Sequence, residues 1–308
     1  MNGTLAPALR SASSALRRVL PDPERPGRVM AAVGWLESTR LLDPATAVAG
    51  RAVRALPLGG ARDVLHGRWL GHAVHPMMVQ VPIGAWMSAA VLDLMPGQRR
   101  AAGILVGTGL ASAGPAALAG WVDWAELHPD QQRVGLVHAV SNQVGVLLYA
   151  GSFLARLRGR HARGRALSFA GLTAVSVGGV LGGHLSFRQA AAVNHADDVA
   201  HVVKPGWHWI GGTETFPVGH PVRCTVGEVP IVVVREADGT LHALADRCSH
   251  QDGPLSQGEI TDGCIECPWH GSVFRLSDGW NVRGPATAPQ PVFETRTVDG
   301  QVEARYRG

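Results

Sequence analysis

The stretch CSHQDGPLSQGEITDGCIECPWHGS, residues 248–272, decides the fold of the last third of this 308-residue chain. It holds two pairs of possible metal ligands, spaced as Cys-x-His, then 16 residues, then Cys-x-x-His. The pairs are Cys248 with His250 and Cys267 with His270. Thiolate and imidazole groups bind zinc as well as iron–sulfur clusters, so the residue types alone leave the metal open.

The order of the ligands favours an iron–sulfur cluster over zinc. Zinc sites with two cysteines and two histidines usually keep the two cysteines in one half. Here each half carries one of each, so two loops can hold a two-iron cluster with both thiolates on one iron and both imidazoles on the other. Pro254 and Pro268 suit stiff loop tips, and Gly271 allows close backbone approach to a sulfide. Zinc remains the alternative.

The chain after Lys204 carries the signals of a small antiparallel β domain. Asp-Gly pairs, which favour tight hairpin turns, begin at residues 238, 252, 262, 278 and 299 and occur nowhere earlier. Residues 230–235 and 241–245 are apolar runs on either side of the first pair, the pattern of a strand, a turn and a strand. We therefore expect an all-β domain over residues 205–308.

Four motifs in this domain resemble the Rieske [2Fe–2S] family: CSH (248–250), CPWHGSVF (267–274), DGW (278–280) and GPA (284–286). The resemblance implies a β-sandwich base with a cluster-binding subdomain formed by two loops. It implies Cys248 and Cys267 as ligands of one iron, and His250 and His270 as ligands of the other. It also implies that Ser272 donates a hydrogen bond to the cluster.

The same resemblance separates two groups of Rieske domains. Cytochrome bc-type members join the two loops by a disulfide, but Gly253 and Trp269 stand at those positions here. The domain therefore resembles the ferredoxin-type and oxygenase-type members. Cys224 and Cys264 lie elsewhere and are expected to be free thiols.

The first half of the chain is far more apolar. Four segments contain no Asp, Glu, Lys or Arg: residues 69–92, 101–121, 134–155 and 166–187. Each has the length of about 20 residues that a bilayer core requires, and all are rich in small residues that favour helix packing in lipid. We expect a multidomain protein, with a four-helix α transmembrane bundle over 69–187 followed by the all-β Rieske iron–sulfur domain. The alternative is a soluble domain of buried helices.

The remaining segments flank the bundle. Residues 1–68 form an Arg/Ala/Pro-rich arm, and residues 188–204 form a polar linker. The motifs GHAVHPMMVQVPIGAW (71–86), GWVDW (120–124), GLVHAVSNQ (135–143) and GGHLSF (182–187) resemble a family of uncharacterised bacterial four-helix membrane proteins, DUF2231. That resemblance implies an integral protein of the bacterial cell membrane, and no activity. Arginines at both membrane sides leave the side of the Rieske domain open.

Four histidines are expected at one face of the membrane. His72 and His75 open the first segment, His138 lies near the start of the third, and His184 lies near the end of the fourth. With four crossings these positions share a face, and the Rieske domain leaves from the same face. They form either an interfacial set that caps helix ends, or a pocket for a b-type haem or a quinone.

The composition excludes one class of partner and leaves several open. The net charge of +4 comes almost wholly from scattered arginines, which indicates contact with membrane lipid and no nucleic acid. We expect an oxidoreductase component that passes single electrons between a membrane-side donor or acceptor, a protein or a quinone, and a protein partner. A catalytic mononuclear iron domain is not expected after His270. The alternatives are the electron-donating component of an oxygenase system and a membrane redox sensor.

Overall fold

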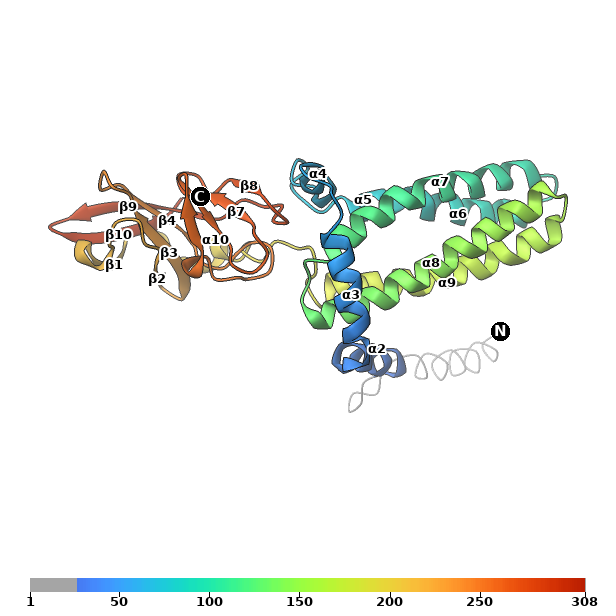
Figure 1. The fold of residues 1–308 in the computed structure, drawn as a ribbon, viewed down its shortest axis with the longest axis horizontal. Helices are drawn as coiled ribbons and strands as arrows, with labels where there is room; N and C mark the ends of the chain where they lie inside the picture. Colours follow the sequence, from blue (N-terminus) through green and yellow to red (C-terminus); the bar gives the residue numbers. More distant parts are fainter. Residues whose placement is uncertain (1–26, 308) are drawn as a thin grey trace, which may run out of the picture.

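The computed structural model describes residues 27–307 of the chain. In Figure 1 a β domain and a helical bundle lie at opposite ends of an elongated molecule, and short helices occupy the region between them. This arrangement confirms a helical first part followed by an all-β domain.

The bundle contains three long helices in succession. They are α7 (Arg99–Trp124), α8 (Pro129–Leu157) and α9 (His161–Phe187). Within residues 27–307 these three are long and apolar enough to cross a membrane. They correspond to the second, third and fourth segments expected from the sequence.

The first expected segment, 69–92, is not one helix. Residues 67–74 form turns, and the helical part begins only at His75, as α5 (His75–Met78) and α6 (Gln80–Asp93). Pro82 has no N–H to donate to the Met78 carbonyl, which explains the interruption at Val79 between the two helices. By itself α6, with 14 residues, is shorter than the roughly 20 that a bilayer core requires.

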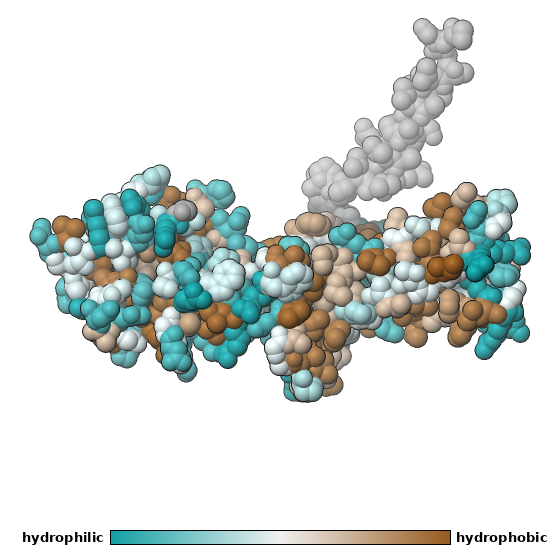
Figure 2. Space-filling view, turned by 90° about the horizontal axis from the view of Figure 1, so that it is seen from above, coloured by the Kyte–Doolittle hydropathy of each residue, from teal (hydrophilic) through white to brown (hydrophobic). Residues whose placement is uncertain are grey.

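Small residues let the bundle helices approach closely. A Cβ on Gly145 of α8 would clash with Val175 of α9, and a Cβ on Gly109 of α7 would clash with the Trp86 indole of α6. Helices in lipid pack through such small residues because the hydrophobic effect cannot drive their association there. Figure 2 shows apolar side chains along the bundle and hydrophilic ones at its tip, away from the β domain.

The described part of the N-terminal arm is helical. It forms α2 (Arg28–Ser38), η1 (Arg40–Leu42), α3 (Asp43–Arg54) and α4 (Ala61–His66). These elements lie around the end of the bundle nearest the β domain (Figure 1). Arg133 of α8 holds Asp43 at 2.6 Å, which ties α3 to the bundle. The rest of the expected arm, residues 1–26, lies outside the described residues.

The β domain is made of two antiparallel sheets. The six-stranded sheet has the order β1 (His208–Gly212), β10 (Gln301–Tyr306), β9 (Val292–Val298), β4 (Leu241–Ala245), β3 (Val229–Arg235) and β2 (Val222–Val226). The four-stranded sheet has the order β5 (Glu259–Thr261), β6 (Cys264–Glu266), β7 (Val273–Arg275) and β8 (Asn281–Arg283). Short helices complete it: α10 (Val199–Val202), η2 (Thr213–Thr215) and η3 (Leu255–Gln257).

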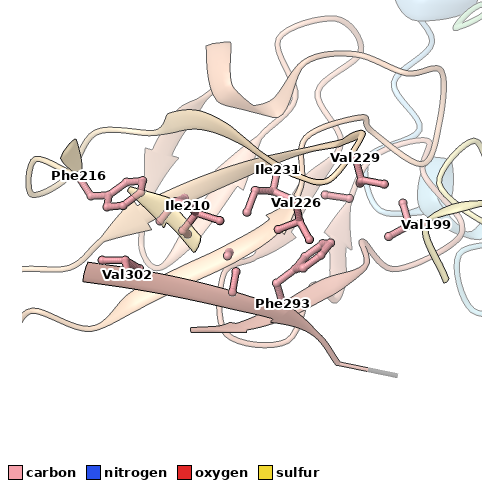
Figure 3. Packing of buried hydrophobic residues seen from close by; sticks show 12 residues of the cluster. Val199, Ile210, Phe216, Val226, Val229, Ile231, Phe293 and Val302 are labelled. Atoms are coloured by element: carbon pink, nitrogen blue, oxygen red, sulfur yellow. The ribbon is translucent and has the colours of Figure 1, made fainter. Parts of the chain in front are cut away.

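Two hydrophobic clusters hold this domain together. Figure 3 shows Ile231 and Phe293 in one hydrophobic cluster, which is formed mainly by side chains of the larger sheet. Val199 of α10 belongs to the same cluster. The second cluster unites Leu244 with Ile265 and Phe274, and so fastens the smaller sheet to the larger one. Alternate residues of β3 and β4 therefore face the two clusters, as expected for strands packed on both sides.

The predicted hairpin around Asp238-Gly239 is confirmed by the antiparallel pairing of β3 with β4, whereas Asp252-Gly253 lies in the loop between β4 and β5 and not in a hairpin turn. Two other Asp-Gly pairs form tight turns. Asp262 and Asp299 adopt positive φ values of 51° and 50°, and the glycines that follow have φ of 70° and 77°. Positive φ at both central residues is the requirement of the type I′ hairpin turn. These turns join β5 to β6 and β9 to β10.

Candidate metal centre

Two loops at one end of the smaller sheet carry the four expected ligands. Cys248 and His250 lie between β4 and β5, and Cys267 and His270 lie between β6 and β7. Each loop is closed by its own backbone: the Cys248 N–H donates to Gly253 O at 2.9 Å, and the Gly271 N–H donates to Cys267 O at 3.1 Å.

The fold places like ligands together. The thiols of Cys248 and Cys267 contact each other. The rings of His250 and His270 lie 5.0 Å apart, between centroids, and are nearly perpendicular. Within residues 27–307 no three Cys, His, Asp or Glu side chains converge on one ion site. The four side chains form a thiol pair and an imidazole pair, the arrangement that would hold a cluster of two irons.

Two further observations show that the site fits such a cluster. The Nδ1 atom of His250 is buried and has no hydrogen-bond partner, a costly state that a metal bond would relieve. A Cβ on Gly253 would lie 2.7 Å from Cys267 Sγ, so the loop leaves no room for a side chain there. The Nδ1 atom of His250 is thus free to bind a metal, and the backbone of Gly253 packs directly against Cys267 Sγ.

The environment keeps the imidazoles neutral. Burial lowers the pKa of His250 well below its usual value, and burial together with the nearby His128 lowers that of His270 to about 4. Contact with Cys267 and burial raise the pKa of the Cys248 thiol, whereas contact with Cys248 lowers that of Cys267 to about 7. Neutral imidazoles and a readily ionised thiol are the forms that bind metal.

Ser272 lies at the base of the second loop and is fully buried, with 0% of its surface exposed. Its Oγ accepts a hydrogen bond from the Ala286 N–H at 3.1 Å, which fixes the oxygen and leaves the hydroxyl proton to be donated elsewhere. A hydrogen bond from this hydroxyl to a cluster stays a prediction. Cys224 and Cys264 lie in β2 and β6, outside both ligand loops, and are free thiols.

The imidazole side of the site faces the helical bundle. His250 lines a cavity of about 20 Å³ together with His66 and Asp123, room for about one water molecule. His66 Nδ1 and Asp123 Oδ1 lie 2.8 Å apart. The ring of His128, which caps the start of α8, lies 6.0 Å from that of His270.

The sequence interpretation did not identify His66 or His128 as site residues. For His128 the sequence does contain a local signal of a helix start, because Gln131 follows three residues later and the two residues form a capping box. This signal indicates the start of α8 and not a metal site. Nothing local connects either residue to ligand positions that lie 120 or more residues later in the chain.

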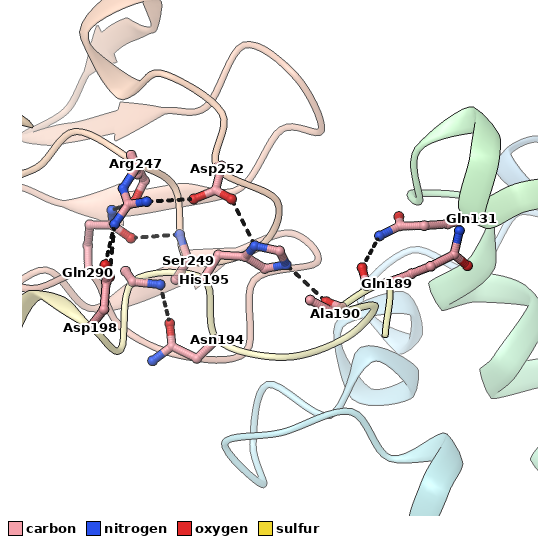
Figure 4. Close-up of polar contacts among 11 residues, drawn as sticks. Gln131, Gln189, Ala190, Asn194, His195, Asp198, Arg247, Ser249, Asp252 and Gln290 are labelled. Carbon is pink, nitrogen blue, oxygen red and sulfur yellow. Dashed lines mark hydrogen bonds and ion pairs between the residues drawn. The ribbon is translucent and has the colours of Figure 1, made fainter. Parts of the chain in front are cut away.

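Several polar contacts hold the β domain against the bundle. In Figure 4 His195 of the linker lies between Asp252, at 2.9 Å from Nδ1, and the Ala190 carbonyl, at 3.0 Å from Nε2. On another side Arg68 donates to the carbonyls of Asn281 and Val282, at 3.1 and 2.6 Å. The first cluster loop is thus held by the linker through Asp252, and β8 is held by the segment before α5 through Arg68.

The four membrane histidines have different partners. His72 lies in the turn before α5 and contacts the Ala73 carbonyl, and His184 pairs with Glu37 of α2 at 2.5 Å. His75 and His138 do meet, with ring centroids 6.3 Å apart. Each ring is anchored through Nδ1 to a backbone carbonyl, His75 to Ala116 O and His138 to Gly178 O, both at 2.8 Å.

Comparison with known proteins confirms both resemblances. Residues 206–294 match the Rieske [2Fe-2S] domain family, and residues 71–195 match the family described as predicted membrane protein (DUF2231). The ferredoxin subunit of anthranilate 1,2-dioxygenase from Burkholderia cepacia is 40% identical over 97 residues, which are 32% of this chain and 89% of that protein. Ferredoxin CarAc from Metapseudomonas resinovorans is 38% identical over 77 residues, 25% of this chain and 71% of that protein.

Among solved structures, a chain in the complex of reduced oxygenase and oxidized ferredoxin in carbazole 1,9a-dioxygenase is similar. It is 30% identical with a TM-score of 0.30, over 32% of this chain and 92% of that chain.

Proposed function

The chain belongs to the Rieske [2Fe–2S] family, and on this premise we propose that it passes single electrons between a membrane-side donor or acceptor and a protein partner. It joins a Rieske ferredoxin-like electron-transfer domain to a predicted membrane domain. When bound, a [2Fe–2S] cluster with two imidazole ligands accepts and releases one electron at a higher potential than an all-thiolate cluster.

We assign the ligands from the pairing of the side chains. Cys248 and Cys267 hold one iron, and His250 and His270 hold the other. The unpartnered Nδ1 of His250 supports this assignment, and so does the contact between the two thiols. The loops bury both cysteines and thereby keep water from the sulfur side.

The observation that carries the electron-transfer proposal is the direction in which the imidazole pair faces. His250 lies over the cavity that His66 and Asp123 also line, and His270 lies against His128 at the start of α8. Electrons that enter or leave through the imidazole ligands therefore have the helical domain as their nearest neighbour. This geometry supports exchange with the membrane side.

The membrane domain is proposed to span the bacterial cell membrane four times. The three long helices each exceed the required length. The remaining crossing, which comes first along the chain, is formed by α5 and α6 together, from His75 to Asp93. The apolar surface of the bundle in Figure 2 supports this reading.

The names of two relatives and the exposure of Trp269 favour an oxygenase component as the protein partner. Two relatives are named as ferredoxins, one of them a ferredoxin subunit of a dioxygenase. The ring of Trp269, beside the ligand His270, lies 5.5 Å from that of His128 but is still 49% exposed, and Pro268 is exposed as well. An accessible aromatic tip next to the cluster suits transient docking, so we propose an oxygenase component as one candidate acceptor.

The contact between His75 and His138 supports a narrower version of the haem or quinone proposal. Each ring donates through Nδ1 to a backbone carbonyl, as histidines that bind through the other nitrogen do. Asn142 Nδ2 donates to Nε2 of His138 at 3.2 Å, so a group that binds through this nitrogen has to displace the amide. We propose that a b-type haem or a quinone binds beside this pair, and not beside all four histidines.

A redox experiment on the full chain tests the proposal. The protein is purified in detergent, reduced with dithionite, and mixed with a lipid-soluble quinone while the EPR signal of the reduced cluster is followed. Membrane-side exchange predicts rapid loss of the signal in the full chain. A reduced cluster that persists with quinone, but is oxidised by a soluble acceptor protein, would contradict the membrane-side part.

A further inference from the structure

The tip of the bundle farthest from the β domain contains a cavity of about 370 Å³. It lies between the end of α6, the loop that follows, and the first residues of α7 and α9. We propose that this cavity binds a phosphate-bearing anion, supplied by the headgroup of an anionic phospholipid. The proposal rests on the proposed crossing of the membrane by this bundle.

The cavity is positively charged. Three arginines and one aspartate line it, Arg99, Arg156, Arg165 and Asp93, so its net charge is +2 with His161 neutral. Asp93 Oδ1 accepts from Arg156 Nη1 at 2.9 Å, and both side chains are about 5% exposed or less. The one carboxylate of the cavity is therefore already paired inside the protein.

The other two arginines remain available to a ligand. Neither Arg99 nor Arg165 forms an ion pair with any residue between 27 and 307, and both are exposed at the cavity. Arg165 Nη1 donates to the Asp93 backbone carbonyl at 3.2 Å, which holds its guanidinium at the rim. Guanidinium groups bind phosphate oxygens in a bidentate manner, and two of them at one cavity form a phosphate clamp.

The backbone at the cavity adds to its positive potential. Two long helices, α7 with 26 residues and α9 with 27, begin at the cavity, and neither has a side-chain cap on its first turn. Helix N-termini present free N–H groups and a partial positive charge, which favour anions. In addition, the Nδ1 atom of His161, the first residue of α9, is buried without a partner.

The surroundings favour a lipid as the source of the phosphate. Leu94 and Met95 line the same cavity and are 73% and 50% exposed, so an acyl chain has apolar surface to contact. The cavity lies where the proposed spanning helices end, at the level of lipid headgroups. Arginine-rich loops are typical of the cytoplasmic side, where the leaflet is anionic.

Isothermal titration of the detergent-solubilised full chain tests the site. The titrants are short-chain phosphatidylglycerol, phosphatidylcholine with the same chains, and inorganic phosphate. The test variant is Arg99→Gln/Arg165→Gln. The matched control is Arg100→Gln/Arg163→Gln, which removes two exposed arginines from the same tip but outside the cavity lining.

We expect phosphatidylglycerol to bind wild type and control alike, and to bind the test variant at least about tenfold more weakly. Binding of inorganic phosphate as tight as that of phosphatidylglycerol would keep the anion site and assign a free anion as its source. Equal binding of phosphatidylcholine, equal weakening in both variants, or no binding of either anion would overturn the proposal. The EPR signal of the dithionite-reduced cluster, recorded on each sample, reports separately on whether the Rieske domain is intact.

Discussion

The ring of His128 lies 6.0 Å from the ring of His270, so a helix that enters the membrane domain begins against a ligand of the proposed cluster. His128 caps the N-terminus of α8, and the same helix carries His138 into the bundle. The residues between the cluster side and the bundle interior therefore belong to one rigid element. The fusion of the two domains therefore places the proposed cluster beside a helix that leads into the membrane domain.

His128→Ala should slow electron exchange between the cluster and a lipid-soluble quinone, because it opens a gap beside His270. Stopped-flow absorbance of the full chain in detergent measures the rate. The control is Gln131→Ala, which removes the other half of the capping box and the bond from Gln131 to Gln189 O, but not the ring contact. Each variant should lose about 1 kcal/mol of stability through the weakened cap, and Gln131→Ala should lose more through the second bond. Equal rates in the two variants would assign His128 a structural role only.

His250→Cys and His270→Cys should each keep an iron–sulfur centre without Rieske character, or lose the cluster. Replacing one imidazole by a thiolate lowers the potential of the iron that it binds. EPR spectra of the reduced variants should shift towards those of all-thiolate clusters. His242→Cys, in the interior strand β4, where the partly buried His242 pairs with Glu236 at 3.2 Å, serves as the control and should leave the spectrum unchanged. An unchanged spectrum in either ligand variant would refute the assignment.

Cys224→Ser and Cys264→Ser should leave the iron content near that of wild type. Both cysteines lie in strands outside the ligand loops, and burial raises the pKa of Cys224 to about 12, so it stays protonated. Cys248→Ser is the comparison and should lose most of the iron. Colorimetric iron analysis of the purified proteins measures this. A loss of half the iron in either of the first two variants would make that cysteine a ligand.

Ser272→Ala should lower the midpoint potential, and Phe274→Tyr should raise it, because donors to the cluster stabilise its reduced form. The shift should be several tens of millivolts, up to about 100 mV, if part of a bond of about 1.5–3 kcal/mol differs between redox states. Ser249→Ala is the matched control, since the Ser249 hydroxyl already donates to Ala288 O at 2.9 Å. A redox titration in which Ser272→Ala and Ser249→Ala behave alike would show that Ser272 does not reach the cluster.

If a haem binds beside His75 and His138, protein produced with haem available should show a Soret band. His138→Ala should abolish the band, whereas His184→Ala should retain it, because His184 pairs with Glu37 away from the other two. An optical spectrum of each purified variant decides this. Absence of the band from wild type would eliminate haem and leave the quinone and interfacial interpretations.

The parts of this protein that could be predicted from sequence are those encoded locally. The Cys-x-His and Cys-x-x-His pairs lie in short loops, so their spacing indicates how the ligands meet, and Asp262-Gly263 encodes its own turn. The length and apolar character of α7, α8 and α9 likewise follow from composition. In the first expected segment Pro82 breaks the hydrogen bonding of a run that hydropathy alone treats as continuous.

The rest depends on contacts between distant segments. The partner of His184 is Glu37, which lies 147 positions earlier in the chain. The position of His66 and His128 beside the ligand loops results from docking of the β domain on the bundle. This docking depends on contacts between residues far apart in the chain, such as Arg68 with Val282. Periodic patterns in the sequence do not predict such contacts.

The most direct test of the central claim is EPR spectroscopy of the dithionite-reduced full chain in detergent, combined with metal and sulfide analysis. The account predicts two irons and two sulfides per chain and the signal of a [2Fe–2S] cluster with two imidazole ligands. A chain that binds zinc without iron, or whose reduced cluster gives the signal of all-thiolate ligation, would contradict the assignment of Cys248, His250, Cys267 and His270.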